Sequence, residues 1–390
     1  MLIPGDVSAP LAMANRSSRK WETEVSSYVT PNKLQRHRAF LNMAPTDRPL
    51  VGSNLFGLFL NEQYPNFSRS IPEGRLVTPD DIRADLFLED CEEHFQAYLA
   101  LDGDYPYIEG ACAYVPWMEA IMGCPIRATA MSMWAEPVID DWEAWTWERP
   151  NLGKNAWALK LLELLDAVID HSGGRYPVAP TLLRGPFDML SALRGATVIP
   201  LDMYDYPSEV RRAAALCTEV WIEVAQAQCA RIPASPHGFF AAPHGLKFWA
   251  PERVIWLQED VASLLSPQFY RDLVKPFDRQ IAAKFPWTGY HVHGTCDWVT
   301  EQLLDMPEVA VIELNHDADE SGEEKVFSAC KKIQGRKPLV IWRDFRKEGF
   351  WPWLERILDE LSPRGLSIQV HVATLDEALA IKESVERVKR

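Results

Sequence analysis

Apolar and amphipathic stretches alternate in a regular order from residue 250 to the C-terminus. Short runs in which nearly every residue is apolar are typical of strands buried on both faces, and helical spacing of apolar positions indicates helices. The strand-like runs are 254–257, 288–293, 309–313, 338–342 and 367–371. The helical stretches that follow them are 266–284, 297–304, 323–333, 351–361 and 375–388. This order predicts consecutive βα units with parallel strands and helices on the outside.

The first half of the chain shows the same patterns less clearly. Residues 49–53 and 178–183 are good strand candidates, whereas 126–133 is a weaker one and 107–113 is possible. The total approaches eight strands, so we expect an α/β fold of the (β/α)8 TIM-barrel type. A doubly wound open sheet is the alternative that a strand count leaves open. Residues 1–40 predict a helical N-terminal extension, and residues 41–390 predict the barrel as one domain.

Composition narrows the class of protein. A chain of 390 residues with 47% hydrophobic residues can bury a substantial single core. A formal net charge of −15 disfavours a nucleic-acid partner. No run approaches the roughly 20 apolar residues of a membrane span, and no signal peptide is visible. The seven cysteines are odd in number and lack framework spacing. We therefore expect a cytoplasmic protein without a membrane or nucleic-acid partner.

Two histidines at the end of one predicted strand carry the clearest chemical signal. Alternate side chains of an extended segment share a face, so His291 and His293 point together while Tyr290 and Val292 point the other way. An imidazole pair on one strand suits a borderline-soft metal such as zinc. The alternative is a pair of hydrogen-bonded histidines in a polar pocket. Their strand position predicts a place at the carboxyl mouth of the barrel, where barrel enzymes build their active sites.

Several segments, in this order along the chain, resemble motifs of the uroporphyrinogen decarboxylase superfamily. They are RHRAFL at 36–41 with DRP at 47–49, LRGPFDMLSALRG at 183–195, LDMYDYPSEV at 201–210, and EDVASLLSPQFY at 259–270 with VKP at 274–276. The first is similar to the opening of the corrinoid-dependent methyltransferase branch. The resemblance covers roughly residues 36–390 and implies a (β/α)8 barrel with an N-terminal helical extension.

The resemblance implies one of two chemistries. The decarboxylase branch is metal-free and holds substrate carboxylates with an Arg-Gln-Ala-Gly-Arg-type segment, and residues 31–57 contain nothing like it. The methyltransferase branch carries a His-x-Cys motif, which resembles His291-Val-His293, and a further ligand near the last strand. There zinc activates a thiol that accepts a methyl group from a methylcorrinoid. Here His293 replaces the cysteine, and His371 stands where the family often has cysteine.

We therefore expect His291, His293 and His371 to bind a divalent metal, with zinc as the expected cofactor. Imidazoles make such a site harder and more positive than thiolates do. It could polarise an ether, a hydroxyl or water as well as bind a thiol.

Acidic residues beside these strands are further candidates. Glu259 and Asp260 follow a predicted strand, so one of them is expected at the mouth as a general base, a substrate anchor or a further metal ligand. The alternative is that they complement the dipole of a helix N-terminus. Glu313 lies inside an apolar strand and must be paired or functional, because an unpaired buried charge is costly. Arg343, at the end of the next strand, could supply its ion-pair partner.

Contacts with the substrate are expected from residues at strand ends and in one loop. They are Asn54, Arg184, His237, His244 and Trp342. For the two loop histidines the alternative is a surface turn, and for Arg184 it is an internal ion pair.

These observations predict a metal-dependent methyltransferase that acts with a corrinoid of the methylcobalamin type, or with a corrinoid protein, on a small-molecule substrate. One alternative is a metal-assisted or metal-free lyase, decarboxylase or hydrolase. Another is a non-catalytic barrel that binds a tetrapyrrole or a small ligand. The habit of the family and the 15 tryptophans also suggest a homodimer.

Overall fold

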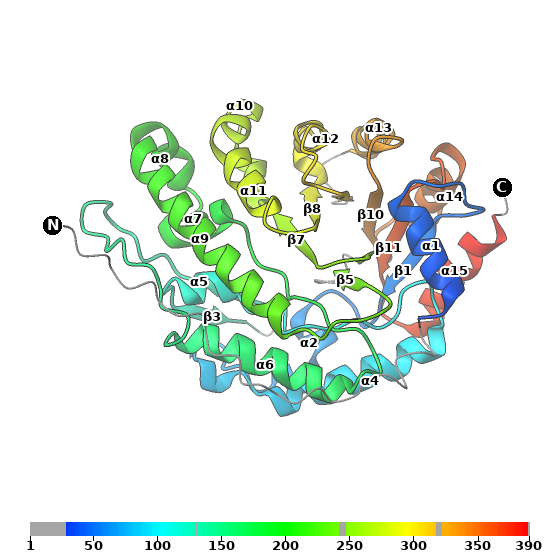
Figure 1. Cartoon of the computed structure of the whole chain (residues 1–390), viewed down its shortest axis with the longest axis horizontal. Coiled ribbons are helices and arrows are strands. Elements are labelled where there is room, and N and C mark those ends of the chain that lie inside the picture. Colours follow the sequence, from blue (N-terminus) through cyan, green and yellow to red (C-terminus); the bar gives the residue numbers. More distant parts are fainter. Residues whose placement is uncertain (1–28, 130, 242–246, 317–321, 389–390) are drawn as a thin grey trace.

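The computed structural model describes residues 29–129, 131–241, 247–316 and 322–388. Its centre is a six-stranded parallel sheet in which the first strand pairs with the last (Figure 1). In spatial order the strands are β1 (Leu50–Asn54), β11 (Leu366–His371), β10 (Leu339–Asp344), β9 (Val311–Asn315), β8 (Trp287–His293) and β7 (Val254–Gln258). Sequential neighbours that return to the first strand are typical of a barrel.

Two extended segments occupy the remaining barrel positions, between β1 and β7. Residues 107–111 and 178–183 are joined to each other by a single parallel bridge. Gly185 then passes so close to β7 that a Cβ atom there would overlap the carbonyl oxygen of Gln258. The eight positions of a (β/α)8 barrel are therefore filled, and the predicted fold is confirmed.

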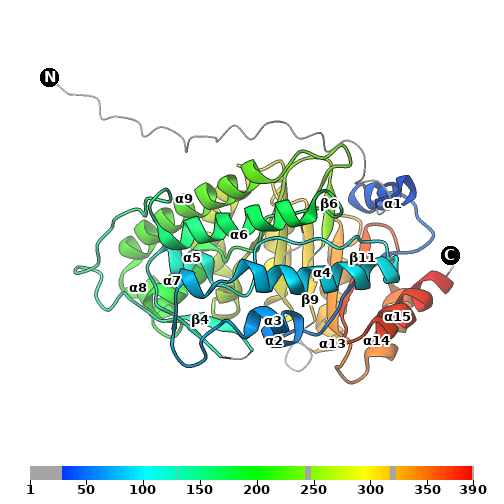
Figure 2. The ribbon, with the colours of Figure 1, turned by 90° about the horizontal axis from the view of Figure 1, so that it is seen from below.

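Helices surround the barrel, and α4, α6 and α9 pack side by side on one face (Figure 2). The helices are α1 (Pro31–Leu41), α2 (Leu60–Gln63), α3 (Pro65–Ser68), α4 (Ala84–Leu101), α5 (Trp117–Ile121), α6 (Ala156–Ser172), α7 (Pro186–Arg194), α8 (Ile199–Asp205), α9 (Pro207–Arg231), α10 (Pro267–Phe269), α11 (Lys275–Ala282), α12 (Val299–Leu304), α13 (Glu323–Ile333), α14 (Phe350–Glu360) and α15 (Leu375–Arg387). Shorter turns are η1 (Pro79–Asp81), η3 (Asp260–Leu264), η4 (Tyr270–Val274) and η5 (Gly294–Cys296). The last three helices match the predicted bounds to within one residue.

The weaker strand prediction, residues 126–133, belongs to a separate small sheet. β3 (Ile126–Ala128) pairs antiparallel with β2 (Leu76–Val77) and with β4 (Met133–Ala135). The segment is thus extended, but the expectation that it supplies a barrel strand is wrong. Its tip, with Met131, Ser132 and Met133, lines the cavity at the carboxyl mouth instead.

A hairpin of β5 (Phe239–Ala241) and β6 (Phe248–Ala250) closes the opposite, amino end of the barrel. Its buried residues Phe240, Phe248 and Trp249 form one apolar cluster with the first residues of the barrel strands, including Leu50 and Val254. Helix α1 packs on the outside of β6. The described residues 239–241 and 247–250 therefore belong to the floor of the barrel rather than to a loop at its mouth.

Side chains replace the missing strand ladder along the open edge of β1. The amide of Val51 donates to Asp104 Oδ2 at 2.9 Å, and Asp104 is paired with buried Arg48. The carbonyl of Ser53 accepts from Tyr98 Oη at 2.5 Å and from Lys247 Nζ at 3.0 Å. Buried main-chain groups need partners, so these side chains complete the hydrogen bonding that a neighbouring strand would provide.

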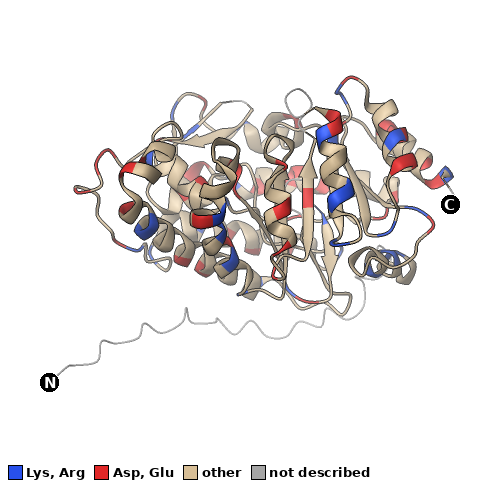
Figure 3. Cartoon of the chain, turned by 90° about the horizontal axis from the view of Figure 1, so that it is seen from above, with Lys and Arg blue, Asp and Glu red and all other residues tan. Residues whose placement is uncertain are grey.

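Charged residues of both signs occupy the same outer helices (Figure 3). Lys332 on α13 pairs with Glu301 on α12, and Lys331 pairs with Glu360 on α14. Exposed pairs of this kind contribute about 1 kcal/mol or less each. Within the described ranges, every helix is too short or too polar to cross a membrane.

Two buried histidines make the stability of the fold depend on pH. His37 Nε2 donates to the carbonyl of Asp104 at 3.0 Å, and His94 Nε2 donates to the carbonyl of Gln63 at 2.7 Å. Burial lowers the pKa of each to about 4, against a usual value of 6.5. The unfolded chain therefore binds more protons between pH 6.5 and 4, and stability falls as the pH falls through this window.

From pH 7 to pH 5 we expect each histidine to lower the free energy of unfolding by about 2 kcal/mol. Urea unfolding of metal-free protein at both pH values measures the loss. His37→Gln and His94→Gln retain a donor and remove the titration, so each should flatten the dependence. An unchanged slope in both variants would contradict the assignment.

Candidate active site

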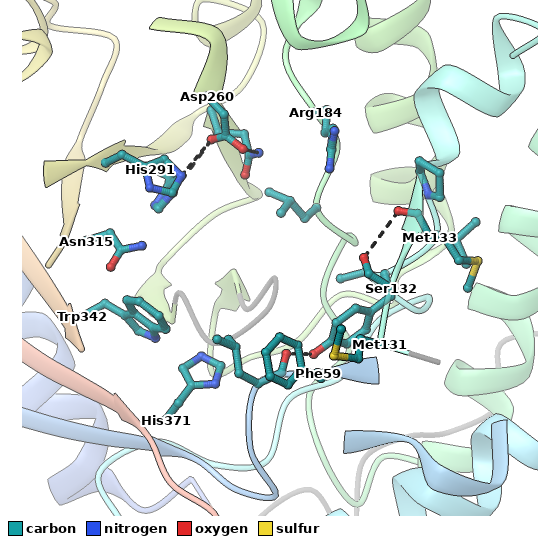
Figure 4. Close-up of a pocket in the computed structure, with 18 of the residues that line it drawn as sticks. Phe59, Met131, Ser132, Met133, Arg184, Asp260, His291, Asn315, Trp342 and His371 are labelled. Atoms are coloured by element: carbon teal, nitrogen blue, oxygen red, sulfur yellow. Dashed lines mark hydrogen bonds and ion pairs between the residues drawn. The ribbon is translucent and has the colours of Figure 1, made fainter. Parts of the chain in front are cut away.

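The carboxyl ends of the barrel strands open into a cavity of about 630 Å³. Small-molecule sites have volumes of roughly 300–1,000 Å³, so this cavity can hold a metabolite-sized ligand. Its polar wall comes from the strand ends and comprises Gln258, Asp260, His291, His293, Asn315, His316, Trp342, Asp344 and His371. Its apolar wall comes from loops and includes Leu58, Phe59, Ala113, Tyr114, Val115, Met131, Met133 and Leu182. Figure 4 shows both walls facing one space.

Three side chains on the polar wall converge as metal ligands do. One ligand atom from each of Asp260, His291 and His293 lies within 4.8 Å of the other two. Asp260 Oδ1 is 3.3 Å from His293 Nε2 and 4.0 Å from His291 Nε2. The predicted face is confirmed, because Tyr290 and Val292 are buried on the other side of β8.

Glu313 lies behind His291 and fixes its orientation. The two residues are opposite each other in the β8–β9 ladder, and the carboxylate contacts His291 Nδ1. The side chain of Glu313 is fully buried. A carboxylate on one ring nitrogen directs the other nitrogen outward, which is the arrangement that metal-ligating histidines commonly have. The structure thus gives Glu313 the ligand histidine as a partner, which the sequence did not indicate.

Reciprocal hydrogen bonds at the start of α7 hold Asp260 at the mouth. The amides of Asp260 and Val261 donate to the carboxylate of Asp188 at 3.0 and 2.8 Å. Burial alone would raise the pKa of Asp260, but the hydrogen bond with His293 and the nearby positive charges lower it to about 2. Asp260 is therefore an anion at neutral pH and offers the cavity a charged oxygen.

Glu259 takes a structural position. It is buried, and its carboxylate accepts hydrogen bonds from the amides of Phe187 at 3.0 Å and Asp188 at 2.9 Å. These amides belong to the first turn of α7, whose unpaired donors favour a carboxylate. Burial and the neighbouring carboxylates Asp278 and Asp188 raise the pKa of Glu259. Glu259 is not among the residues that line the cavity, whereas Asp260 lies there beside His291 and His293; a catalytic role for either carboxylate stays a prediction.

His371 lies on the same wall but is not brought to the other two histidines (Figure 4). Its Nδ1 donates to the carbonyl of Gly57 at 3.0 Å, so Nε2 accepts from the Asn54 amide at 3.1 Å. The ring stands edge-on to Trp342, with centroids 4.9 Å apart. The sequence predicts His371 as the third metal ligand. In the structure Asp260, and not His371, lies beside His291 and His293.

Arg184 projects into the cavity as predicted, and beside it lies a carboxylate that the sequence reading missed. Glu119 on α5 is fully buried, and its nearest cation is Arg184 Nε at 3.6 Å. Among the described residues neither carboxylate oxygen of Glu119 has a hydrogen-bond partner. Helix α5 follows the possible strand 107–113, but Glu119 itself belongs to no motif that singled it out in the sequence.

Of the two loop histidines, the described one, His237, is not among the residues that line this cavity. His237 lies in the turn before β5, at the amino end of the barrel, where its carbonyl accepts from Trp249 Nε1 at 2.6 Å. Apolar packing of the hairpin under the barrel carries it away from the mouth. His244 lies outside the described residues.

The residues that are present fit zinc. Two imidazole nitrogens and one carboxylate oxygen are ligands that Zn²⁺ accepts, and three protein ligands with an open position are typical of catalytic zinc. The buried carboxylate on His291 supplies the supporting contact that such sites use.

Comparison with known proteins supports the fold. No family model and no curated protein matches the chain. A methyltransferase from Methanosarcina mazei superposes with a TM-score of 0.60 at 17% identity, covering 90% of this chain and 98% of that one. The metallated homocysteine methyltransferase MmuM from Escherichia coli gives a TM-score of 0.39 at 13% identity, covering 90% and 99%. The chain thus has the fold of a solved methyltransferase, as the superfamily resemblance implied.

The metal content of variants distinguishes the ligand group with Asp260 from the predicted group with His371. We expect one zinc per chain in wild type, a loss of about tenfold or more in affinity in Asp260→Asn and His293→Ala, and retention in His371→Ala. Plasma mass spectrometry of protein dialysed against limiting zinc measures this. Loss of metal in both His293→Ala and His371→Ala, with retention in Asp260→Asn, would restore the three-histidine group, and no metal in wild type would refute the site.

The support from Glu313 can be tested separately. Glu313→Gln should weaken zinc binding by about 10–100-fold, because an amide holds the imidazole less strongly than a carboxylate. Asp278→Asn is the matched control, since Asp278 is also buried behind β8 but accepts from Tyr290 Oη at 2.7 Å, on the opposite face. Competition with a chromogenic chelator gives both affinities. Equal affinities in the two variants would contradict the role of Glu313.

Proposed function

We propose that the protein is a metal-dependent methyltransferase that moves a methyl group between a corrinoid and a small substrate. The observation that supports this proposal most is the convergence of Asp260, His291 and His293 at the mouth of a metabolite-sized cavity. The fold shared with a methyltransferase and the superfamily resemblance agree with this proposal.

The three residues of the ligand group and Glu313 would have different roles. Asp260, His291 and His293 would hold zinc, and Glu313 would keep His291 in the productive tautomer. When bound, zinc would act as a Lewis acid on the heteroatom that gains or loses the methyl group. Because Asp260 is already ionised at neutral pH, the site does not need to release a proton from this ligand before it binds metal.

The two walls of the cavity would orient the substrate. Arg184 offers a guanidinium to an anionic group, and Glu119 offers a buried carboxylate to a donor group. Phe59 and Met131 are 39% and 50% exposed at the rim, where an apolar surface can exclude water from the reacting atoms. A corrinoid is too large for this cavity, so its methyl-bearing face would approach through the mouth, free or on a partner protein. A homodimer and a cytoplasmic location stay predictions.

The ligand group of Asp260, His291 and His293 also favours a second candidate function, that of a metal-assisted hydrolase or lyase. It contains a carboxylate and two imidazoles and no cysteine sulfur. Oxygen and nitrogen donors without thiolate are common in zinc hydrolases, where activation of water is the metal's task.

Methyl transfer is tested with zinc-loaded protein, methylcobalamin and a panel of thiol, phenol and amine acceptors. We expect loss of the cobalt–methyl absorbance with at least one acceptor, and a decrease in rate of about 100-fold or more in His293→Ala. His171→Ala is the matched control, because His171 lies at the end of α6 and contacts Tyr176 Oη.

No demethylation by fully loaded wild type with any acceptor would refute the proposal. Turnover of an ester, ether or hydroxy acid without corrinoid, lost in His293→Ala, would establish the second candidate.

A further inference from the structure

A second, smaller chamber of about 50 Å³ lies in the seam between β1 and residues 107–111. It shares Ala113 and Tyr114 with the large cavity. Its polar lining includes Lys247, Glu109 and Thr181. By comparison with the space that one water needs, the chamber has room for about three or four non-hydrogen atoms.

Lys247 reaches this chamber from the hairpin that floors the barrel. Its side chain is buried, and Nζ donates to the Ser53 carbonyl at 3.0 Å and to Tyr98 Oη at 2.7 Å. These two acceptors use two of the positions on the tetrahedral nitrogen. The remaining position holds either a third proton or the lone pair. Burial lowers the pKa of Lys247 to about 7, so a large fraction of the amine is neutral at physiological pH.

Glu109 lines the same chamber. Its carboxyl group accepts from Tyr64 Oη at 3.0 Å, from Tyr107 Oη at 2.7 Å and from the amide of Gly110 at 3.0 Å. Burial raises the pKa of Glu109, and the nearby charge of Lys247 lowers it in part. A buried amine and a buried carboxyl group therefore border one small space, and burial shifts the pKa of each toward its neutral form.

An unsatisfied polar group points to a ligand in this space. Thr181 is 6% exposed, and its hydroxyl has no hydrogen-bond partner among the described residues. Buried hydroxyls normally have a partner, so the chamber is built for a polar guest. A guest larger than a few atoms does not fit this space.

We propose that Lys247 forms an imine with a small aldehyde in this chamber, with Glu109 as the proton donor. The lone pair of Lys247 Nζ attacks the carbonyl carbon, and one amine proton moves to the carbonyl oxygen to give a carbinolamine. Glu109 then protonates the hydroxyl group, which leaves as water while the carbon–nitrogen double bond forms. An iminium cation and a Glu109 carboxylate replace the neutral pair, so the net charge of the chamber is unchanged.

Reductive trapping on the intact full-length protein tests this proposal. The probe is acetaldehyde, which has three non-hydrogen atoms, with sodium cyanoborohydride at pH 7, followed by peptide mapping of ethylated lysines. Lys337 is an internal control, because it is half-buried and its Nζ also donates to two main-chain carbonyls, those of Met306 at 2.8 Å and Val309. We expect Lys247 to be ethylated about tenfold faster than Lys337.

Glu109→Gln should slow the trapping of Lys247 and leave that of Lys337 unchanged, and Glu92→Gln, which alters an exposed carboxylate on the neighbouring helix, should change neither. The test on wild type needs no variant, so it holds even if a variant fails to fold. Ethylation of Lys247 no faster than that of Lys337 would overturn the proposal and leave Lys247 as a cation that only completes the edge of β1. The result does not depend on methyl transfer or on metal.

Discussion

The exclusion of water from both faces of a closed parallel sheet is the constraint on which this structure depends. Every polar group inside the barrel must then find a partner within the protein. Glu313 meets this demand through His291, and Glu259 meets it through the first amides of α7. The open edge of β1 meets it through Asp104 and Lys247. The pairings of Glu313 and Lys247 also fix side chains that the chemistry proposed at the mouth and in the seam would use.

The same constraint separates the neighbouring carboxylates Glu259 and Asp260. Glu259 turns inward, where α7 supplies its donors, and the main-chain amide of Asp260 binds Asp188 in return. Asp260 is thereby left facing the histidines of β8. One turn thus connects the packing of α7 to the position of a candidate metal ligand, and we expect a change at Asp188 to alter the site although Asp188 does not line the cavity.

Local sequence patterns predict much of the fold and part of the candidate site. Buried parallel strands have near-continuous apolar runs, so β7 to β11 and their helices could be placed, as could the shared face of His291 and His293. Of the two segments joined by one bridge, 178–183 was a good strand candidate and 107–113 only a possible one, because neither forms a ladder with its neighbours. The roles of Glu119 and Lys247 depend on contacts between distant segments, and nothing in their local sequence records those contacts. His371 was assigned by its strand end, but its partners Asn54 and Gly57 come from the other end of the chain.

The replacement of a thiolate by His293 and the presence of Asp260 are best understood together. A thiolate supplies one negative charge to zinc, and a neutral imidazole supplies none. Asp260 restores that charge through oxygen, so a Zn²⁺ ion held by this group would carry a formal charge of 2 − 1 = +1. The resemblance implies up to two thiolates, at the positions of His293 and His371, so Asp260 compensates for the charge of one of them while the softness of sulfur is lost. A site with that balance still attracts an anionic nucleophile, but it discriminates less strongly in favour of sulfur over oxygen. The rest of the cavity, above all Arg184 and Glu119, would therefore decide which substrate atom binds at such a site, more than the preference of the metal.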